Sequence, residues 1–309
     1  MSKVIASAPG KINIFFAVGP LGADGFHDVF SIYQALNLRE EITVTASSEW
    51  LVKVSGALSA EQLSAVPTGE ENLVVRAAKI VAAAAEIQQP HPVKFEISKN
   101  VPVAGGMGGG SADAAAALMA VDELWCTGVE GDALLKAAAE LGADVPFALL
   151  GGTAIGTGKG HELVPLDSVK RLHWVLVANQ KGLSTPSVYK RLDELRSGRG
   201  QDPTKVPKPT APKELLAALL SGDPSLVAPL LHNDLQEAAL DLMPELSETI
   251  ANGLAAGALA AMVSGSGPTI ALLAQDSAAA SAIASQLAAQ GHTAIATFGP
   301  AAGTILEKN

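Results

Sequence analysis

The strongest constraint on the fold is a glycine-rich segment between an expected strand and an expected helix. Residues 93–98 (VKFEIS) alternate between apolar and polar side chains, which is typical of a strand with one buried face. Apolar side chains recur at helical spacing from about residue 112 to residue 125, and the segment before them reads VPVAGGMGGGS. Its glycines let the backbone approach an anion, and the first helical turn adds free N–H groups. A tight strand-to-helix connection would use glycine as well, so this segment alone leaves both interpretations open.

Two well-known phosphate loops do not match this segment. A Walker loop requires a lysine before its Ser or Thr, but Gly110 is followed directly by Ser111. The dinucleotide pattern G-x-G-x-x-G begins at Gly106 and Gly108 but meets Ser111 where its last glycine should stand. An anion-binding loop here therefore belongs to another type.

The composition fits a mixed α and β protein of 309 residues, which is long enough for two domains. The net charge of −10 argues against a broad nucleic-acid surface or an anionic membrane surface, since both require a basic field. The single cysteine, Cys126, excludes an internal disulfide and a multi-cysteine zinc site, and we expect it to be buried on an apolar helix face. No apolar run approaches the roughly 18 residues of a membrane helix, and no signal peptide is evident, so we expect a cytoplasmic protein.

The pattern predicts several further elements and two boundaries. We expect a strand at Val4–Ala8, a turn at Pro9-Gly10 and an alternating strand at Lys11–Val18 that places Lys11 and Asn13 on one face. The glycine-rich residues 152–160 mark an expected domain boundary, and residues 196–213 are expected to form an exposed, mobile loop. Other expected strands span 41–46, 51–54 and 174–178, and other expected helices span 72–86 and 132–141.

Two charged residues are candidates for chemistry, although each has an ordinary structural interpretation. Lys11 could extend to solvent past the apolar strand that carries it, or it could face a phosphoryl group. Asp144 precedes Val145-Pro146 and could cap a helix, or it could act on a substrate. The two interpretations of Asp144 are compatible, since a helix amino terminus and a nearby lysine both favour an ionised carboxylate.

Three segments, in order and spacing, resemble the signature motifs of the GHMP kinases. They are PGKINIFF at Pro9–Phe16, VPVAGGMGGGSADAAAAL at Val101–Leu118 and MVSGSGPT at Met262–Thr269. Within that family, ADGFHDV at Ala23–Val29, LGADVPF at Leu141–Phe147 and NDL at Asn233–Leu235 resemble the branch that phosphorylates 4-diphosphocytidyl-2-C-methyl-D-erythritol in the non-mevalonate isoprenoid pathway.

The resemblance implies an ATP-dependent kinase that moves a phosphoryl group to the 2-hydroxyl of this small cytidine diphosphate alcohol. Lys11 and Asp144 would be the catalytic residues, with Asp144 as the base and Lys11 as its charge partner. The ATP-binding residues implied are Pro102, Val103, Ala104, Gly105, Gly106, Met107, Gly108, Gly109, Gly110, Ser111 and Ala112. Ser111 is also the candidate contact for Mg²⁺.

The substrate-binding residues implied are Asn13, Phe26, His27, Tyr189, Gly265, Ser266 and Gly267. Two features depart from the family pattern. Phe26 stands where a tyrosine is usual, and Gly158–Glu162 (GKGHE) replaces a shorter Gly-Arg-Gly-Glu run and receives no assigned role.

The family fold implied is a two-domain α+β fold, with an ATP-binding domain at residues 1–156, a substrate domain at 157–309 and the active site in the cleft between them. A monomer or homodimer is expected. Two alternatives stay open from the sequence: a GHMP kinase for homoserine or a mevalonate-type acceptor, and a catalytically silent nucleotide-binding protein.

Overall fold

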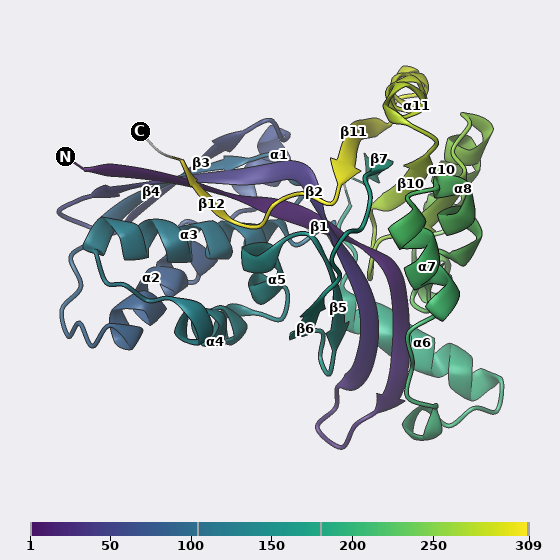
Figure 1. Cartoon of the computed structure of the whole chain (residues 1–309), viewed down its shortest axis with the longest axis horizontal. Helices are drawn as coiled ribbons and strands as arrows, with labels where there is room; N and C mark the ends of the chain where they lie inside the picture. Colours follow the sequence, from purple (N-terminus) through teal and green to yellow (C-terminus); the bar gives the residue numbers. More distant parts are fainter. Residues whose placement is uncertain (1, 104, 180, 308–309) are drawn as a thin grey trace.

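A computed structural model describes residues 2–103, 105–179 and 181–307. The chain forms two lobes, each built on one sheet with helices packed against it (Figure 1). Among the described helices, none has the length and apolarity needed to cross a membrane.

The larger sheet is organised by two long antiparallel strands, β1 (Lys3–Leu21) and β2 (His27–Ala46). Its main path runs β12-β1-β2-β4-β3, where β3 is Leu51–Gly56, β4 is Val93–Lys99 and β12 is Ile305–Glu307. The strands β5 (Thr153–Thr157) and β6 (Glu162–Pro165) extend the sheet from β2, and β8 (His232–Asn233) pairs with β1. Most of the segment expected to be a domain boundary therefore lies in this sheet.

The turn expected at Pro9-Gly10 is wrong, because β1 continues through it. The pairing with β2 shifts register between Pro9 and Lys11, which is a bulge. A bulge tolerates a proline that cannot donate a ladder hydrogen bond. At Gly10 a β carbon would lie 3.1 Å from the Val101 side chain, so glycine also permits close packing against the start of the glycine-rich segment.

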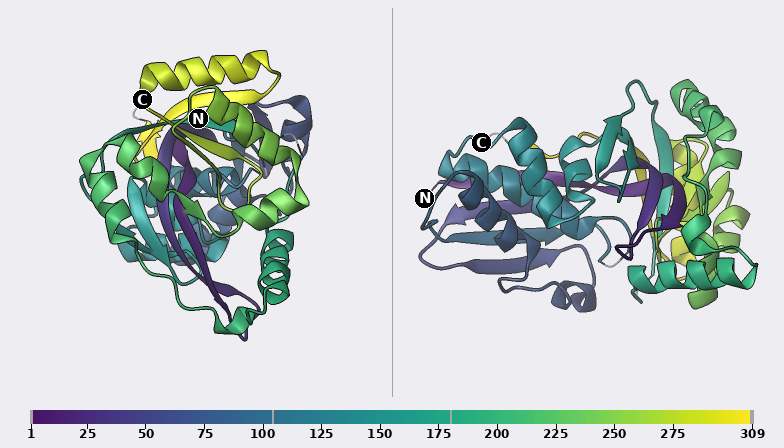
Figure 2. Two further views of the ribbon diagram at one scale, coloured as in Figure 1. Left: turned by 90° about the vertical axis from the view of Figure 1, so that its right-hand side faces the viewer. Right: turned by 90° about the horizontal axis from the view of Figure 1, so that it is seen from below.

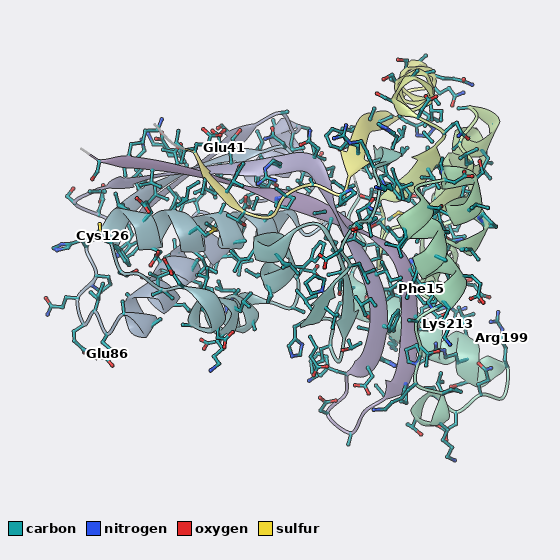
Figure 3. The ribbon with its side chains drawn as sticks, in the orientation of Figure 1. Phe15, Glu41, Glu86, Cys126, Arg199 and Lys213 are labelled. Atoms are coloured by element: carbon teal, nitrogen blue, oxygen red, sulfur yellow. The ribbon has the colours of Figure 1, made fainter. Side chains whose placement is uncertain are left out.

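Four helices cover one face of the larger sheet (Figure 1): α2 (Leu73–Ala84), α3 (Gly109–Trp125), α4 (Gly131–Leu141) and α5 (Val145–Leu150). The short helix α1 (Ala60–Ser64) lies beside β3 and buries none of its residues. The helix α3 begins three residues before the expected start. Its alanines are fully buried, because small side chains let the helix lie close to the sheet. Cys126, at the end of α3, is exposed rather than buried (Figure 3), because the chain leaves the helix there in a left-handed conformation.

The smaller sheet has the order β11-β7-β10-β9 and is antiparallel throughout. Its strands are β7 (Leu172–Ala178), β9 (Ala260–Val263), β10 (Ile270–Ala274) and β11 (Thr293–Gly299). The helices of this lobe are α6 (Thr185–Gly198), α7 (Lys213–Ser221), α8 (Pro224–Val227), α9 (Gln236–Leu242), α10 (Glu245–Ala255) and α11 (Ser277–Ala289), with short 3-10 turns at Pro203–Lys205 and Ala228–Leu230.

The expected exposed loop at residues 196–213 is wrong at both ends, because residues 196–198 belong to α6 and Lys213 begins α7. Arg196 belongs to α6 and is buried, and it donates a 2.7 Å hydrogen bond to the Val18 carbonyl. It also lies 3.3 Å from Asp234. A buried guanidinium needs such partners to compensate for lost hydration. Arg196 thereby ties α6 to the far end of β1, where the β1–β2 hairpin extends beside α6 (Figure 2).

The two sheets share one apolar core and a buried polar contact. Ile12, Ile14 and Ile32 of the larger sheet pack in the same cluster as Leu176 of the smaller one. Within this core, the Trp174 indole donates a 2.8 Å hydrogen bond to the side-chain carbonyl of Gln34, and both side chains are fully buried. This contact fixes β7 against β2 across the junction of the lobes.

Replacing Trp174 with Phe is expected to weaken this junction. The change leaves the Gln34 carbonyl without its donor and opens a small void, so the free energy of unfolding should fall by about 2–4 kcal/mol. Trp50→Phe is the control, because Trp50 is only partly buried and packs in a different cluster, and it should cost about 1 kcal/mol or less. Urea denaturation measures both variants, and equal losses would contradict the role given to Trp174.

Candidate active site

Lys11 and Asp144 meet in the structure although they are far apart in sequence. The Lys11 ammonium lies 3.5 Å from Asp144 Oδ2 and donates a 2.9 Å hydrogen bond to Asn13 Oδ1. Lys11 is buried, so it does not extend to solvent. Asp144 precedes α5 but makes no capping hydrogen bond with its side chain, so its carboxylate faces Lys11 instead. The pairing of Lys11 and Asn13 on one face of β1 follows the alternation in the sequence.

The glycine-rich loop places backbone directly beside this pair. Gly106 and Gly108 have positive φ angles of 72° and 70°, which disfavour any residue with a β carbon. A β carbon at Gly108 would lie 3.4 Å from the Lys11 side chain and 3.8 Å from Asp144 Oδ2. At Gly106 it would lie 2.6 Å from the Ser264 carbonyl, so the loop also touches the SGSGP segment closely. The glycines therefore bring three parts of the chain together.

The pair lines the second of three adjoining cavities. The first, of about 310 Å³, lies at the start of α3 and is lined by Lys99, Asp113, Pro102, Val103 and Gly105–Ser111 among others. Gly106 and Gly108 also line the second cavity, together with Lys11, Asn13, Asp144, Lys159, Tyr189, Gly265 and Ser266. The third is lined by Phe26, His27, Lys159, Tyr189 and Asp193 among others. We call the first cavity the anion cradle, after the role expected of its glycine-rich loop, and the third the aromatic pocket. Lys11 and Asp144 stand between the two.

Most residues expected to bind a ligand line one of these cavities, and three differ. Ala112 is fully buried in the core beneath α3. Gly267 packs toward Val263, since a β carbon on it would lie 2.8 Å from that side chain. Ala104 lies outside the described residues.

The aromatic pocket is built from α6 and the start of β2. The His27 ring stacks on Tyr189 with 5.4 Å between ring centroids. Its Nδ1 lies 3.0 Å from the Gly19 carbonyl and its Nε2 lies 3.1 Å from Asp193 Oδ2, so both ring nitrogens are engaged. Burial, and then the charge of Asp144, raise the pKa of the Tyr189 hydroxyl, which keeps it neutral. The pocket therefore has a rigid aromatic wall.

Lys159 lines two of these cavities, and the sequence did not single it out. Its ammonium lies 4.2 Å from the Phe26 ring centroid and 2.6 Å from Asp24. Phe26 itself is 61% exposed, so Lys159 covers one face of an otherwise open ring. Lys159 lies in the GKGHE segment, where a lysine within a glycine-rich turn was the only available signal. Asp193 also lines the third cavity, and the sequence could not predict this, because its partner His27 belongs to a different element.

Two family models match the chain. The amino-terminal domain of the GHMP kinases matches residues 72–152, and the carboxy-terminal domain of the GHMP kinases matches residues 215–293. The chain belongs to the GHMP kinase family. It is a kinase, and as a member of this family it uses ATP.

This GHMP kinase has curated relatives that carry one name. A 4-diphosphocytidyl-2-C-methyl-D-erythritol kinase of Paenarthrobacter aurescens is 48% identical over 305 residues, which cover 97% of this chain and 94% of that protein. One of Nocardia farcinica is 49% identical over 290 residues, covering 94% and 91%.

Solved structures agree with the two-domain α+β fold expected for the GHMP kinase. A crystal structure of 4-(cytidine 5'-diphospho)-2C-methyl-D-erythritol kinase aligns with a TM-score of 0.77 at 31% identity, covering 96% of this chain and 100% of that one. A homoserine kinase from Cytophaga hutchinsonii aligns with a TM-score of 0.69 at 20% identity, covering 99% and 98%, which shows the fold alone.

Beneath the anion cradle, the GHMP kinase holds a second buried lysine with two carboxylates. Lys99 lies 2.5 Å from Glu40 and 2.8 Å from Asp113, and all three side chains are buried. Gly109 packs directly on this triad, since a β carbon there would lie 3.0 Å from Glu40 and 3.3 Å from Lys99. The triad therefore joins β2 and β4 to the first turns of α3.

The triad carries one more acid than base, and this shifts its titration. Burial, and then the Asp113 charge, raise the pKa of Glu40 to about 8. Burial raises the pKa of Asp113 to about 6 despite the opposing effect of Lys99. Burial alone would lower the pKa of Lys99, but the two carboxylates outweigh it and raise that pKa. Ionised Asp113 is thus disfavoured in the folded state, and its buried Oδ1 has no hydrogen-bond partner in the described part of the chain.

Asp113→Asn is expected to stabilise the protein in a pH-dependent way. The folded-state pKa of Asp113 is above its ordinary value of 3.8, so the wild-type protein loses stability as pH rises between about 4 and about 6. Asparagine does not ionise, so the free energy of unfolding should rise by about 1–3 kcal/mol above pH 6, and this gain should disappear near pH 4. Urea denaturation across this range measures the difference. A gain of the same size at every pH would contradict the titration assigned to Asp113.

Proposed function

We propose that this kinase transfers the γ-phosphoryl group of ATP to the 2-hydroxyl of 4-diphosphocytidyl-2-C-methyl-D-erythritol. The observation that carries this proposal is the position of Lys11 and Asp144, where the anion cradle adjoins a cavity that leads to an aromatic pocket. A phosphate donor on one side and a cytosine-bearing acceptor on the other would meet at this pair. The names of the curated relatives support the same acceptor.

Asp144 is proposed to orient the acceptor hydroxyl and take its proton. As the hydroxyl oxygen bonds to the γ-phosphorus, the bond from that phosphorus to the β–γ bridging oxygen breaks, and ADP leaves with the electron pair. A carboxylate is a weak base for an alcohol, but in a loose phosphoryl transfer deprotonation can lag behind bond cleavage. Positioning by Asp144 would then supply much of the rate.

Lys11 is proposed to balance negative charge on the transferring group. Its ammonium is held by Asn13 on one side and faces Asp144 on the other, so it has a fixed place at the junction of the cavities. A preorganised cation in a partly dehydrated site stabilises charge that develops in the transition state.

The glycine-rich loop is proposed to hold the phosphates of ATP. Residues 105–111 line the first cavity, and the start of α3 adds N–H groups directed at the same space. Within the described residues, no three His, Cys, Asp or Glu side chains gather as a metal site. We therefore propose that Mg²⁺ takes most of its ligands from phosphate oxygens and water, with the Ser111 hydroxyl as the protein contact.

The third cavity is proposed to hold the cytidine. Tyr189 offers a neutral ring for stacking, His27 supports that ring, and Phe26 lies at the mouth of the same cavity. Lys159 lines both the second and the third cavities, so its ammonium is suited to the anionic link between the two ends of the acceptor. The division into domains at residues 1–156 and 157–309, with the site in the cleft between them, also stays a proposal.

Asp144→Asn and Lys11→Ala are each expected to lower kcat by about 10²–10⁴-fold while the fold survives, because each removes a group that acts on the reacting atoms. Substrate-dependent ADP release measures this. Glu140→Gln is the control, since Glu140 is exposed on α4, and its kcat should equal that of the wild type. Near-normal turnover of Asp144→Asn would rule out its proposed role.

Replacing Tyr189 should weaken binding of the cytidyl acceptor without affecting the binding of ATP. Tyr189→Leu removes the stacking surface, which is worth about 1–3 kcal/mol for a base, so KM for the cytidyl acceptor should rise about 5–150-fold while KM for ATP stays unchanged. Tyr189→Phe keeps the ring and should bind the acceptor almost normally.

The wild-type kinase is assayed beside these variants with homoserine and mevalonate as acceptors. Phosphorylation of either one, without turnover of the cytidyl compound, would overturn the proposed acceptor.

A further inference from the structure

A short segment, residues 232–236, lies between the strand that carries Lys11 and the SGSGP segment, residues 264–268. Its strand β8 runs parallel to β1 at Phe15 and Phe16, and the Asp234 N–H donates a 2.9 Å hydrogen bond to the Phe16 carbonyl. The Asp234 carboxylate accepts a further bond of 2.8 Å from the Val18 N–H. Backbone and side chain therefore fix this segment to β1.

The Asn233 side chain extends from this anchored segment to the SGSGP segment. Its amide nitrogen donates to the Val263 carbonyl at 2.8 Å and to the Gly265 carbonyl at 2.7 Å. Its oxygen accepts from the Leu235 N–H at 2.9 Å, and because that group only donates, the orientation of the amide is determined. Asn233 is buried, so water does not readily replace these partners.

Gly265, whose carbonyl accepts one of these two bonds, also lies against Lys11 and Asn13. A β carbon on Gly265 would lie 3.1 Å from Asn13 Oδ1 and 3.7 Å from Lys11 Nζ. The next residue, Ser266, exchanges a 2.8 Å hydrogen bond with Thr185 at the start of α6. The hydrogen bond from the Asn233 amide to the Gly265 carbonyl thus helps to set the distance between the SGSGP segment and Lys11.

We infer that Asn233 is a positioning residue for phosphoryl transfer, which holds the SGSGP segment at the distance from Lys11 and Asn13 that the reacting groups require. This inference rests on the proposed function. Asn233 lines none of the three cavities and acts only through Gly265. Misplacement of aligned groups by about 1 Å costs about 10²-fold in rate, so loss of the amide donors should lower kcat more than it affects substrate binding.

Asn233→Asp is the decisive variant, because it keeps the size and removes both N–H donors. A carboxylate oxygen would then face two carbonyl oxygens, and the segment should move away. We expect kcat to fall at least 30-fold, with KM for ATP and for the cytidyl acceptor within about threefold of the wild type. Asn233→Ala adds no charge, and its kcat should fall by about 10-fold while both KM values stay close to those of the wild type.

Gln236→Glu is the matched control. Gln236 contacts Val263, the residue before the SGSGP segment. Its side-chain oxygen accepts a 2.9 Å bond from the Val263 N–H, and a carboxylate accepts equally well. Its position in the first turn of α9 also favours a negative charge. Its kcat should stay within twofold of the wild type.

Hydrogen exchange supplies a readout that does not depend on turnover. In Asn233→Asp, the amides of residues 264–267 should exchange faster, while those of β10 should not change. If both Asn233 variants fold and keep kcat within threefold and exchange unchanged, the inference is wrong; equal effects in Gln236→Glu would also overturn it. Failure of the wild type to phosphorylate the cytidyl acceptor would count against the proposed function, and the exchange result would still decide whether Asn233 holds the segment.

Discussion

The long antiparallel pairing of β1 and β2 carries residues into two of the three cavities and into the triad beneath the first. Near its middle, Lys11 and Asn13 line the second cavity, and at its far end His27 lines the aromatic pocket. Glu40 of β2 reaches the triad beneath the anion cradle. Because ladder hydrogen bonds fix the register, the distances between these groups are set by one continuous element rather than by the relative position of two domains.

The two buried lysines differ in their surroundings, and this separates their roles. Lys99 has two buried carboxylates within 2.8 Å, so its charge is more than compensated and it serves to join elements. Lys11 has a neutral amide and one partly exposed carboxylate at 3.5 Å. Its charge is therefore less fully compensated and is available to an anion in the adjoining cavity. This electrostatic difference is why Lys11 rather than Lys99 is proposed to act on the phosphoryl group, although both are buried beside glycines of the same loop.

The sequence singled out the residues that are proposed to react, but it missed several residues that the structure places beside them. Alternation along residues 11–18 placed Lys11 and Asn13 together, and the motifs brought Asp144 and the glycine loop into one site. Lys159, Asp193 and the triad were missed, because each depends on a partner from a distant element. Arg196 and Cys126 were wrongly placed for a related reason. Local polarity predicted exposure for the arginine and local apolarity predicted burial for the cysteine, whereas packing and the end of α3 decided both.

By itself, the sequence determined the local features: which segments alternate, where glycine permits close backbone approach, and the order of the family motifs. These depend on interactions between near neighbours, which residue type and spacing specify directly. Only the tertiary structure decided that β1 continues through Pro9-Gly10 and that Asp144 turns to Lys11 instead of capping α5. It also decided that the cavity lined by this pair adjoins the other two. The reason is physical. Burial and strand register bring together groups more than 100 residues apart, and the free energy of those contacts outweighs the local preference of each residue.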